Sequence, residues 1–222
     1  MFRVIKKRLI LNPVSVIIII LAVFVINYNG VYCFSQAENK SQNKEHAENE
    51  VKKQELIVYY DKNYPDNHYH PSGRIGDAQD LKFDDGWENM PVSGKTCVRI
   101  EYRAQGDFGW VGLYWLNPEL NWGNQRGGGY DLRFAKKLTF WAKGEKGGEH
   151  IAVFKFGGIK GLYTDSDNHG IGPLVLTADW KQYTVDVSKR NMRYISAGFS
   201  FALTKAHNRE GCVFYIDDIK YE

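Results

Sequence analysis

The fold is decided by residues 195–203, which read Ile-Ser-Ala-Gly-Phe-Ser-Phe-Ala-Leu. Apolar side chains at the odd positions alternate with small ones at the even positions, and this period of two is typical of a β-strand with one face in a core. The small even-numbered residues are Ser196, Gly198, Ser200 and Ala202. They leave room above the outer face of the predicted strand.

The same period of two continues on both sides of this run. It is found in residues 96–102, 138–142 and 183–187, and the last run, residues 212–221, is rich in aromatic and β-branched residues. Glycine-rich breaks at 127–129, 147–148 and 157–158 separate the runs, and no stretch after Ile26 keeps the 3.6-residue period of a helix. We therefore expect an all-β domain of about nine or ten short strands, folded as an antiparallel two-sheet jelly-roll β-sandwich over residues 57–222.

Residues 1–37 have the composition of a signal peptide. Four basic residues and no acidic one precede a run of 13 largely apolar residues, Val14 to Ile26, which is shorter than the about 20 that a membrane-spanning helix needs. Ser35 and Ala37 place small residues where a signal peptidase cleaves, so we expect cleavage after Ala37. The alternative is an uncleaved membrane anchor extended through Tyr32. In both cases we expect the domain to be exported, whether periplasmic, on the cell surface or secreted.

The charge balance changes once the signal peptide is set aside. Four of the 29 basic residues precede Ala37, which leaves 25 basic against 26 acidic residues and a net charge of −1. This balance gives no reason to expect a nucleic-acid partner.

Residues 38–56 are charged and amide-rich with almost no apolar side chain, so we expect a disordered polar tether there.

Aromatic side chains on the outer faces of predicted strands are the main candidates for a binding site. The odd positions of residues 110–115 form an apolar core face, which leaves Trp110 and Tyr114 on the other face with Gly112 between them. Trp141 likewise shares the parity of polar neighbours. Outward rings beside a floor of small residues suit a sugar, whose C–H face packs on an aromatic ring while its hydroxyls meet polar groups. The alternative is that long loops cover these rings.

The loop at residues 117–126 follows this strand directly and carries three further candidates. They are Asn121, Trp122 and Arg126. Loops that combine a large aromatic with amide and basic side chains are typical of ligand sites, and equally of loops held in place by their own tryptophan.

Other chemistry is weakly indicated. The sequence has no Gly-x-Ser-x-Gly, His-Glu-x-x-His or phosphate-loop motif, so we do not expect an enzyme. Cys97 and Cys212 follow the signal peptide and an exported protein could pair them, but their strand parities place them on opposite faces. Carboxylates near both ends of the domain, at Asp61 and Asp217, could supply oxygen ligands to a hard cation such as calcium.

Three strands carry a resemblance to a known family. Residues 214–219, Phe-Tyr-Ile-Asp-Asp-Ile, resemble the closing strand of carbohydrate-binding jelly rolls of the galactose-binding-like superfamily. Residues 180–187, Trp-Lys-Gln-Tyr-Thr-Val-Asp-Val, and 138–144, Leu-Thr-Phe-Trp-Ala-Lys-Gly, are similar to other strands of these modules. The resemblance covers most of residues 57–222 and is closest to carbohydrate-binding module family eleven and its uncharacterised bacterial relatives.

The resemblance implies a function and a metal. It implies an exported, non-catalytic module that binds a poly- or oligosaccharide. In such modules the first Asp of the closing motif often helps to bind a structural calcium, which points to Asp217, with Asp61 as a weaker partner. The alternative is a structural or protein-interaction sandwich without sugar binding, whose partner would be another envelope protein. A glycan-active enzyme is a less favoured reading.

Overall fold

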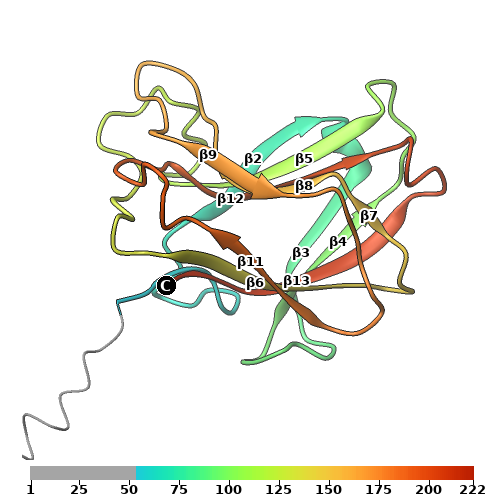
Figure 1. Ribbon diagram of the computed structural model, residues 1–222. Helices are drawn as coiled ribbons and strands as arrows, with labels where there is room; N and C mark the ends of the chain where they lie inside the picture. Colours follow the sequence, from blue (N-terminus) through green and yellow to red (C-terminus); the bar gives the residue numbers. More distant parts are fainter. Residues whose placement is uncertain (1–53) are drawn as a thin grey trace, which may run out of the picture. The chain divides into compact units, whose positions relative to one another are not determined.

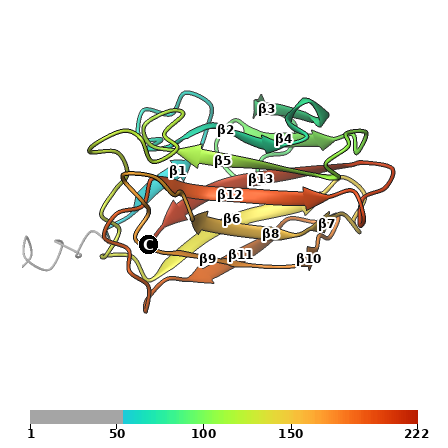
Figure 2. The same cartoon turned by 90° about the horizontal axis from the view of Figure 1, so that it is seen from above.

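Two antiparallel sheets make up the part of the chain that the computed structural model describes, residues 54–222 (Figure 1). They pack face to face, with loops joining the strands at both ends (Figures 1 and 2). The predicted all-β, two-sheet sandwich is therefore confirmed. Its first strand begins at Leu56, one residue before the expected boundary. The predicted signal peptide and nearly all of the tether lie outside the described residues.

The larger sheet has six strands. β11 (Lys181–Asp186), β6 (Lys137–Gly144), β13 (Cys212–Tyr221), β4 (Cys97–Tyr102) and β3 (Leu81–Trp87) lie side by side in this order. β1 (Leu56–Tyr59) also pairs with β13, beyond the end of β4. The first and last strands of the described chain are thus hydrogen-bonded to each other.

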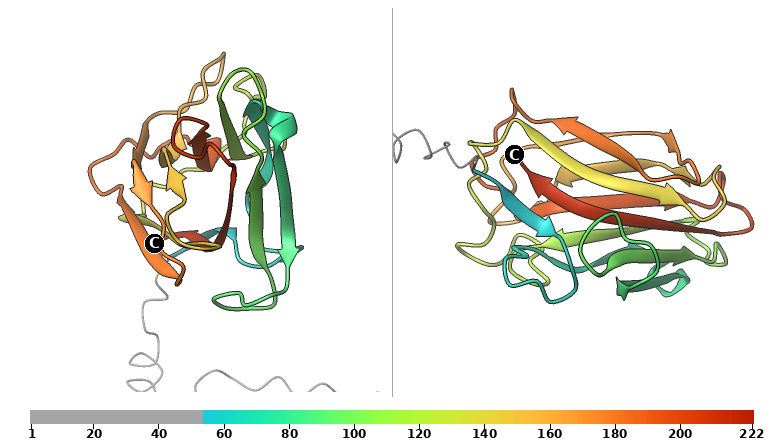
Figure 3. Two further views of the ribbon diagram at one scale, coloured as in Figure 1. Left: turned by 90° about the vertical axis from the view of Figure 1, so that its right-hand side faces the viewer. Right: turned by 90° about the horizontal axis from the view of Figure 1, so that it is seen from below.

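The second sheet has five strands, in the order β2 (His70–Gly76), β5 (Trp110–Leu116), β12 (Ala197–Thr204), β8 (Val153–Gly157) and β9 (Asn168–Ile171). A two-stranded ribbon of β7 (His150–Ile151) and β10 (Leu174–Val175) and a single 3₁₀ turn, η1 (Ala78–Asp80), complete the described elements. No helix in this part of the chain is long and apolar enough to cross a membrane. Figure 3 shows the same strands in two further views.

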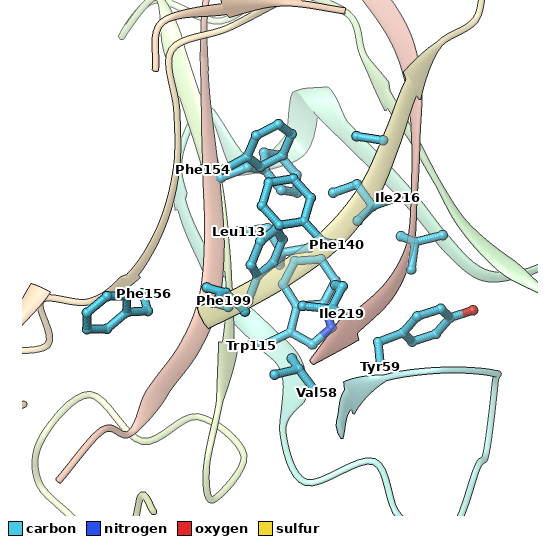
Figure 4. Close-up of a cluster of buried hydrophobic side chains, with 14 of the residues drawn as sticks. Val58, Tyr59, Leu113, Trp115, Phe140, Phe154, Phe156, Phe199, Ile216 and Ile219 are labelled. Atoms are coloured by element: carbon cyan, nitrogen blue, oxygen red, sulfur yellow. The ribbon is translucent and has the colours of Figure 1, made fainter. Parts of the chain in front are cut away.

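Aromatic rings from both sheets fill the core (Figure 4). Trp115 of β5 is fully buried and meets Phe199 of β12 edge-on, with ring centres 5.4 Å apart. Phe140 of β6, in the other sheet, packs against Phe199 and against Phe154 of β8. The ring centres are 5.0 Å apart in the first pair and 4.7 Å apart in the second. Ring pairs of this kind add about 0.5–1.5 kcal/mol each beyond the burial of their area. They join the two sheets where the period-two patterns predicted inward apolar faces.

The outer face of β12 is less open than its sequence predicts. Gly198 lies in a β-bulge, and a Cβ there would come within 2.5 Å of the Tyr69 ring. Ser196 is buried, and its N–H and hydroxyl both donate to Oδ1 of Asp165. Only Ser200 and Ala202, of the four small residues, remain on the outer face of the sheet.

The cysteines do not form the disulfide that an exported setting would allow. Cys97 and Cys212 are both free. Cys97 lies opposite Trp87 of β3, whereas Cys212 lies opposite Tyr102 of β4. Burial raises the pKa of each thiol to about 12, so both stay protonated at neutral pH.

Candidate functional site

The outer face of the five-stranded sheet carries most of the predicted binding residues. Cross-strand pairing places one row of side chains across four strands: Ile75, Gly112, Ala202 and Val153. The next row contains Gly73, Tyr114, Ser200 and Lys155. The middle of this face is therefore lined by small side chains or none.

Trp110 stands at one end of this face. Its cross-strand partner is Thr204, and 39% of its surface is exposed. The ring lies against Gly76, where a Cβ would come within 3.0 Å of it. Trp110 is thus partly packed on glycine backbone and presents the rest of its ring outward, as the sequence predicts.

Tyr114 lies under other side chains. It is only 8% exposed and packs with Leu116 and Ile159 in a small second core outside the sheet. The ring of Trp122 meets it edge-on at 5.7 Å, and the Lys155 ammonium lies 5.3 Å from its ring centre. The prediction of an exposed Tyr114 is wrong, because loop residues cover it. Trp122, itself 38% exposed, is the ring that faces solvent at this end.

Two loops packed against each other form this cover. The carbonyl of Gly123, in the 117–129 loop, accepts a hydrogen bond of 2.9 Å from the N–H of Tyr163. A Cβ on Gly161 would lie 2.6 Å from the same oxygen. Glycine is needed at that position because the two backbones approach too closely for any side chain.

Asn121 holds the loop together. It is fully buried, its Nδ2 donates to the carbonyl of Asn117 at 3.0 Å, and its Oδ1 accepts the N–H groups of Gly123 and Gln125. Its side chain has no exposed surface, so the hydrogen bonds within the loop are its observed role, and its part in ligand binding stays a prediction. Arg126, on the same loop, is exposed and makes no hydrogen bond or ion pair to any described residue.

Trp141 lies on a different face. It is in β6 of the six-stranded sheet, opposite Gln182 of β11 and Asp217 of β13. It points away from the core, as predicted, but on the side of the sandwich opposite Trp110 and Tyr114. The single platform predicted from these three rings is therefore wrong, since they belong to the outer faces of two different sheets.

Two polar residues of the five-stranded face escaped the sequence analysis. Lys155 lies between the core residues Phe154 and Phe156, so strand alternation alone would have placed it outward. Thr204 ends β12 with the same parity as Ser200. Neither is aromatic or amide-bearing, and the search for sugar-binding side chains passed over both.

The aspartates predicted to bind calcium meet the loop at residues 91–96. Oδ2 of Asp217 accepts the N–H of Val92 at 2.7 Å. Oδ1 of Asp61 accepts the N–H groups of Lys95 at 2.8 Å and Thr96 at 2.7 Å. The structure thus brings both aspartates to one loop, although they are distant in sequence.

These contacts do not fit a calcium ion. Calcium takes six to eight oxygen ligands, whereas here N–H groups direct the positive ends of their dipoles at the carboxylates. Asp218, next to Asp217, accepts the hydroxyl of Ser93 at 2.8 Å. Residues 54–222 contain no group of three or more His, Cys, Asp or Glu side chains arranged to hold a metal. Calcium binding stays an untested prediction.

The charge of Asp217 is disfavoured where it lies. Its side chain is fully buried, and burial raises the pKa of its carboxyl to about 7. This value already includes the N–H of Val92, which lowers the pKa of Asp217, and the negative charge of Asp218, which raises it. Burial also raises the pKa of Asp218. Near neutral pH, the carboxyl of Asp217 is therefore partly protonated.

Comparison with known proteins finds similar solved structures. No protein-family model and no curated protein matches the sequence. A family 30 carbohydrate-binding module is 15% identical, with 77% of this chain and 88% of that chain covered and a TM-score of 0.47. A family 11 module from Clostridium thermocellum, solved with a β-1,3-1,4-mixed-linked tetrasaccharide, is 13% identical, with 75% and 94% covered and a TM-score of 0.46. At these values the likeness adds nothing to the fold described above, and no residue role is taken from it.

Proposed function

We propose that this chain is an exported, non-catalytic module that binds a poly- or oligosaccharide on the outer face of its five-stranded sheet. One observation carries the proposal. Trp110 and Trp122 both expose part of their rings on this face. The strand positions between them carry small side chains or none, at Gly112, Ser200 and Ala202, although Ser200 and Gly112 are buried beneath their neighbours.

The spacing of the rings suits a chain of sugars. Trp110 and Tyr114 are four residues apart in β5, which is about 13 Å along an extended strand. Trp122 contacts Tyr114, so the two exposed rings are far enough apart to stack on different units of one saccharide. The Lys155 ammonium lies on the same face as a hydrogen-bonding group for sugar hydroxyls. The Thr204 hydroxyl also lies there and already shares a hydrogen bond of 3.0 Å with Nδ1 of His207.

A second candidate is docking of another protein. Leu120 is 56% exposed and Leu162 is 88% exposed, and each belongs to one of the two loops that pack on each other beside Trp122. Exposed leucines of this kind are typical of protein-interaction surfaces more than of sugar sites. The two functions can be distinguished by finding which residues are needed for binding.

The test is a glycan array with the protein, followed by affinity measurements for the best ligand. Trp110→Ala and Trp122→Ala should each weaken binding about tenfold, because a sugar ring can no longer stack on the indole. Met90→Ala is a control away from this face, because Met90 is exposed at 67% but lies in the loop beside Trp180. An array with no saturable glycan ligand, or a glycan affinity that both tryptophan variants leave unchanged, would contradict this sugar site and favour the protein-docking function.

A further inference from the structure

A pocket of about 290 Å³ lies on the opposite side of the sandwich from Trp110. It is on the outer side of the six-stranded sheet, where β1, β13, β6 and β11 meet. Its volume is at the lower end of the range for small-molecule sites, about 300–1,000 Å³, so it is of a size for one ring and not for a polymer segment.

Aromatic rings form much of its wall. Trp141 comes from β6, and Tyr60 and Tyr64 come from the turn that follows β1. The two tyrosine rings meet edge-on with centres 4.9 Å apart. All three side chains are partly exposed, so their ring faces and edges are open to a ligand.

The polar groups of this wall are free. The indole N–H of Trp141, the hydroxyls of Tyr60 and Tyr64 and the amide of Gln182 have no hydrogen-bond partner among residues 54–222. Together they offer donors and acceptors around a small apolar surface. A compact ring with hydroxyls around its edge uses both features at once.

Charged groups complete the rim. The Lys220 ammonium is 3.0 Å from Oε2 of Glu55, and the Asp218 carboxylate is held by the hydroxyl of Ser93. Lys220 and Glu55 form an ion pair, while the carboxylate of Asp218 accepts only a neutral hydroxyl, so the rim disfavours an anionic ligand. A neutral sugar fits this balance.

We propose that Trp141, Tyr60, Tyr64 and Gln182 form a second sugar site, which takes a single pyranose unit. It shares no residue with the face that carries Trp110 and Trp122. An experiment can therefore contradict one of the two sites without contradicting the other.

The experiment titrates the protein with glucose, galactose, mannose, N-acetylglucosamine and glucuronate, and follows the indole N–H resonances of its six tryptophans by NMR. Trp141→Phe assigns the Trp141 resonance by removing it. We expect at least one neutral sugar to shift this resonance saturably. Gln182→Ala should weaken that response about fivefold, as the loss of one hydrogen bond would.

Thr184→Ala is the matched control, because Thr184 is exposed on the same face of the same strand but does not line the pocket. It should leave the titration unchanged, as should Trp110→Ala. A Trp141 resonance that no sugar in the panel moves would overturn the proposal, and so would equal losses with Gln182→Ala and Thr184→Ala. A shift of the Trp110 and Trp122 resonances alone would support the proposed function while overturning the second site.

Discussion

Trp110 and Trp141 project from opposite faces of the sandwich, Trp110 from β5 of the five-stranded sheet and Trp141 from β6 of the six-stranded sheet. The aromatic core that includes Trp115 and Phe140 lies between the two sheets. A ligand that stacks on one of the two outer rings therefore cannot touch the other. Each ring has to be tested as part of its own surface.

Replacing Trp110 should have a moderate effect on stability. Because its ring is packed on Gly76 on one side and exposed on the other, Trp110→Ala should lower the free energy of unfolding by about 1–2 kcal/mol. Trp115→Ala is the buried comparison and should lower it by about 3–5 kcal/mol. Urea unfolding gives both values. Equal losses in the two variants would mean that Trp110 is a core residue.

Tyr114 should behave as a core residue with a dispensable hydroxyl. Tyr114→Ala should lower the free energy of unfolding by about 3 kcal/mol, because it leaves a cavity between Trp122 and Ile159. Tyr114→Phe keeps the ring and its hydroxyl makes no hydrogen bond to a described residue, so stability should change by less than about 0.5 kcal/mol. Thermal melts compare the two. A large loss in the Phe variant would contradict the packing described here.

Asp217 should make the domain less stable as pH rises. Its pKa is about 7 in the folded state against an ordinary value of 3.8, so between these values the folded state binds more protons than the unfolded state. The free energy of unfolding should therefore fall from about pH 4 to about pH 7 and level off above, by on the order of 4 kcal/mol at 1.36 kcal/mol per unit. Urea titrations at a series of pH values measure this slope.

The Asp217→Asn variant isolates this contribution. An amide cannot ionise, so the difference in stability between the natural protein and the variant should change across this pH window. The variant should also carry a constant loss, because its amide N–H₂ group faces either the N–H of Val92 or that of Asp218. Parallel pH profiles for the two proteins would show that Asp217 keeps its ordinary pKa.

Calcium should leave the melting midpoint unchanged. The N–H groups of Val92, Lys95 and Thr96 already donate hydrogen bonds to Oδ2 of Asp217 and Oδ1 of Asp61. Binding to the folded state alone would add RT ln(1 + [L]/Kd), about 2.7 kcal/mol at a hundredfold excess over Kd. Melts with calcium and with chelator therefore test the prediction drawn from the resemblance. A raised midpoint that Asp217→Ala abolishes would restore the structural calcium.

The sequence predicted which side of each strand faces the core, but not which sheet a strand joins. Alternation placed Trp110 and Trp141 outward, as found, because the pleat repeats every two residues. Sheet membership depends on pairing between distant segments: β6 lies between β11 and β13, and β5 lies between β2 and β12. No local pattern carries that information.

The burial of Tyr114 beneath loop residues could not be predicted from the sequence either. It depends on Ile159, 45 residues further along the chain, and on the contact between two glycine-containing loops. Tyr60 and Tyr64 had a visible signal, since aromatic residues are dense after the first strand. That signal meant little without the partner ring of Trp141, which the fold alone brings to the pocket.

The back-to-back arrangement of the two outer faces has a consequence for assembly. Packed sheets are about 10 Å apart, so two saccharides on opposite faces would be held at a fixed spacing by a rigid core. One flexible strand would have to bend sharply around the sheet edge to reach both sites. The domain would instead hold a saccharide chain on the Trp110 face and a single sugar unit of another molecule, such as a chain end, in the pocket on the opposite face.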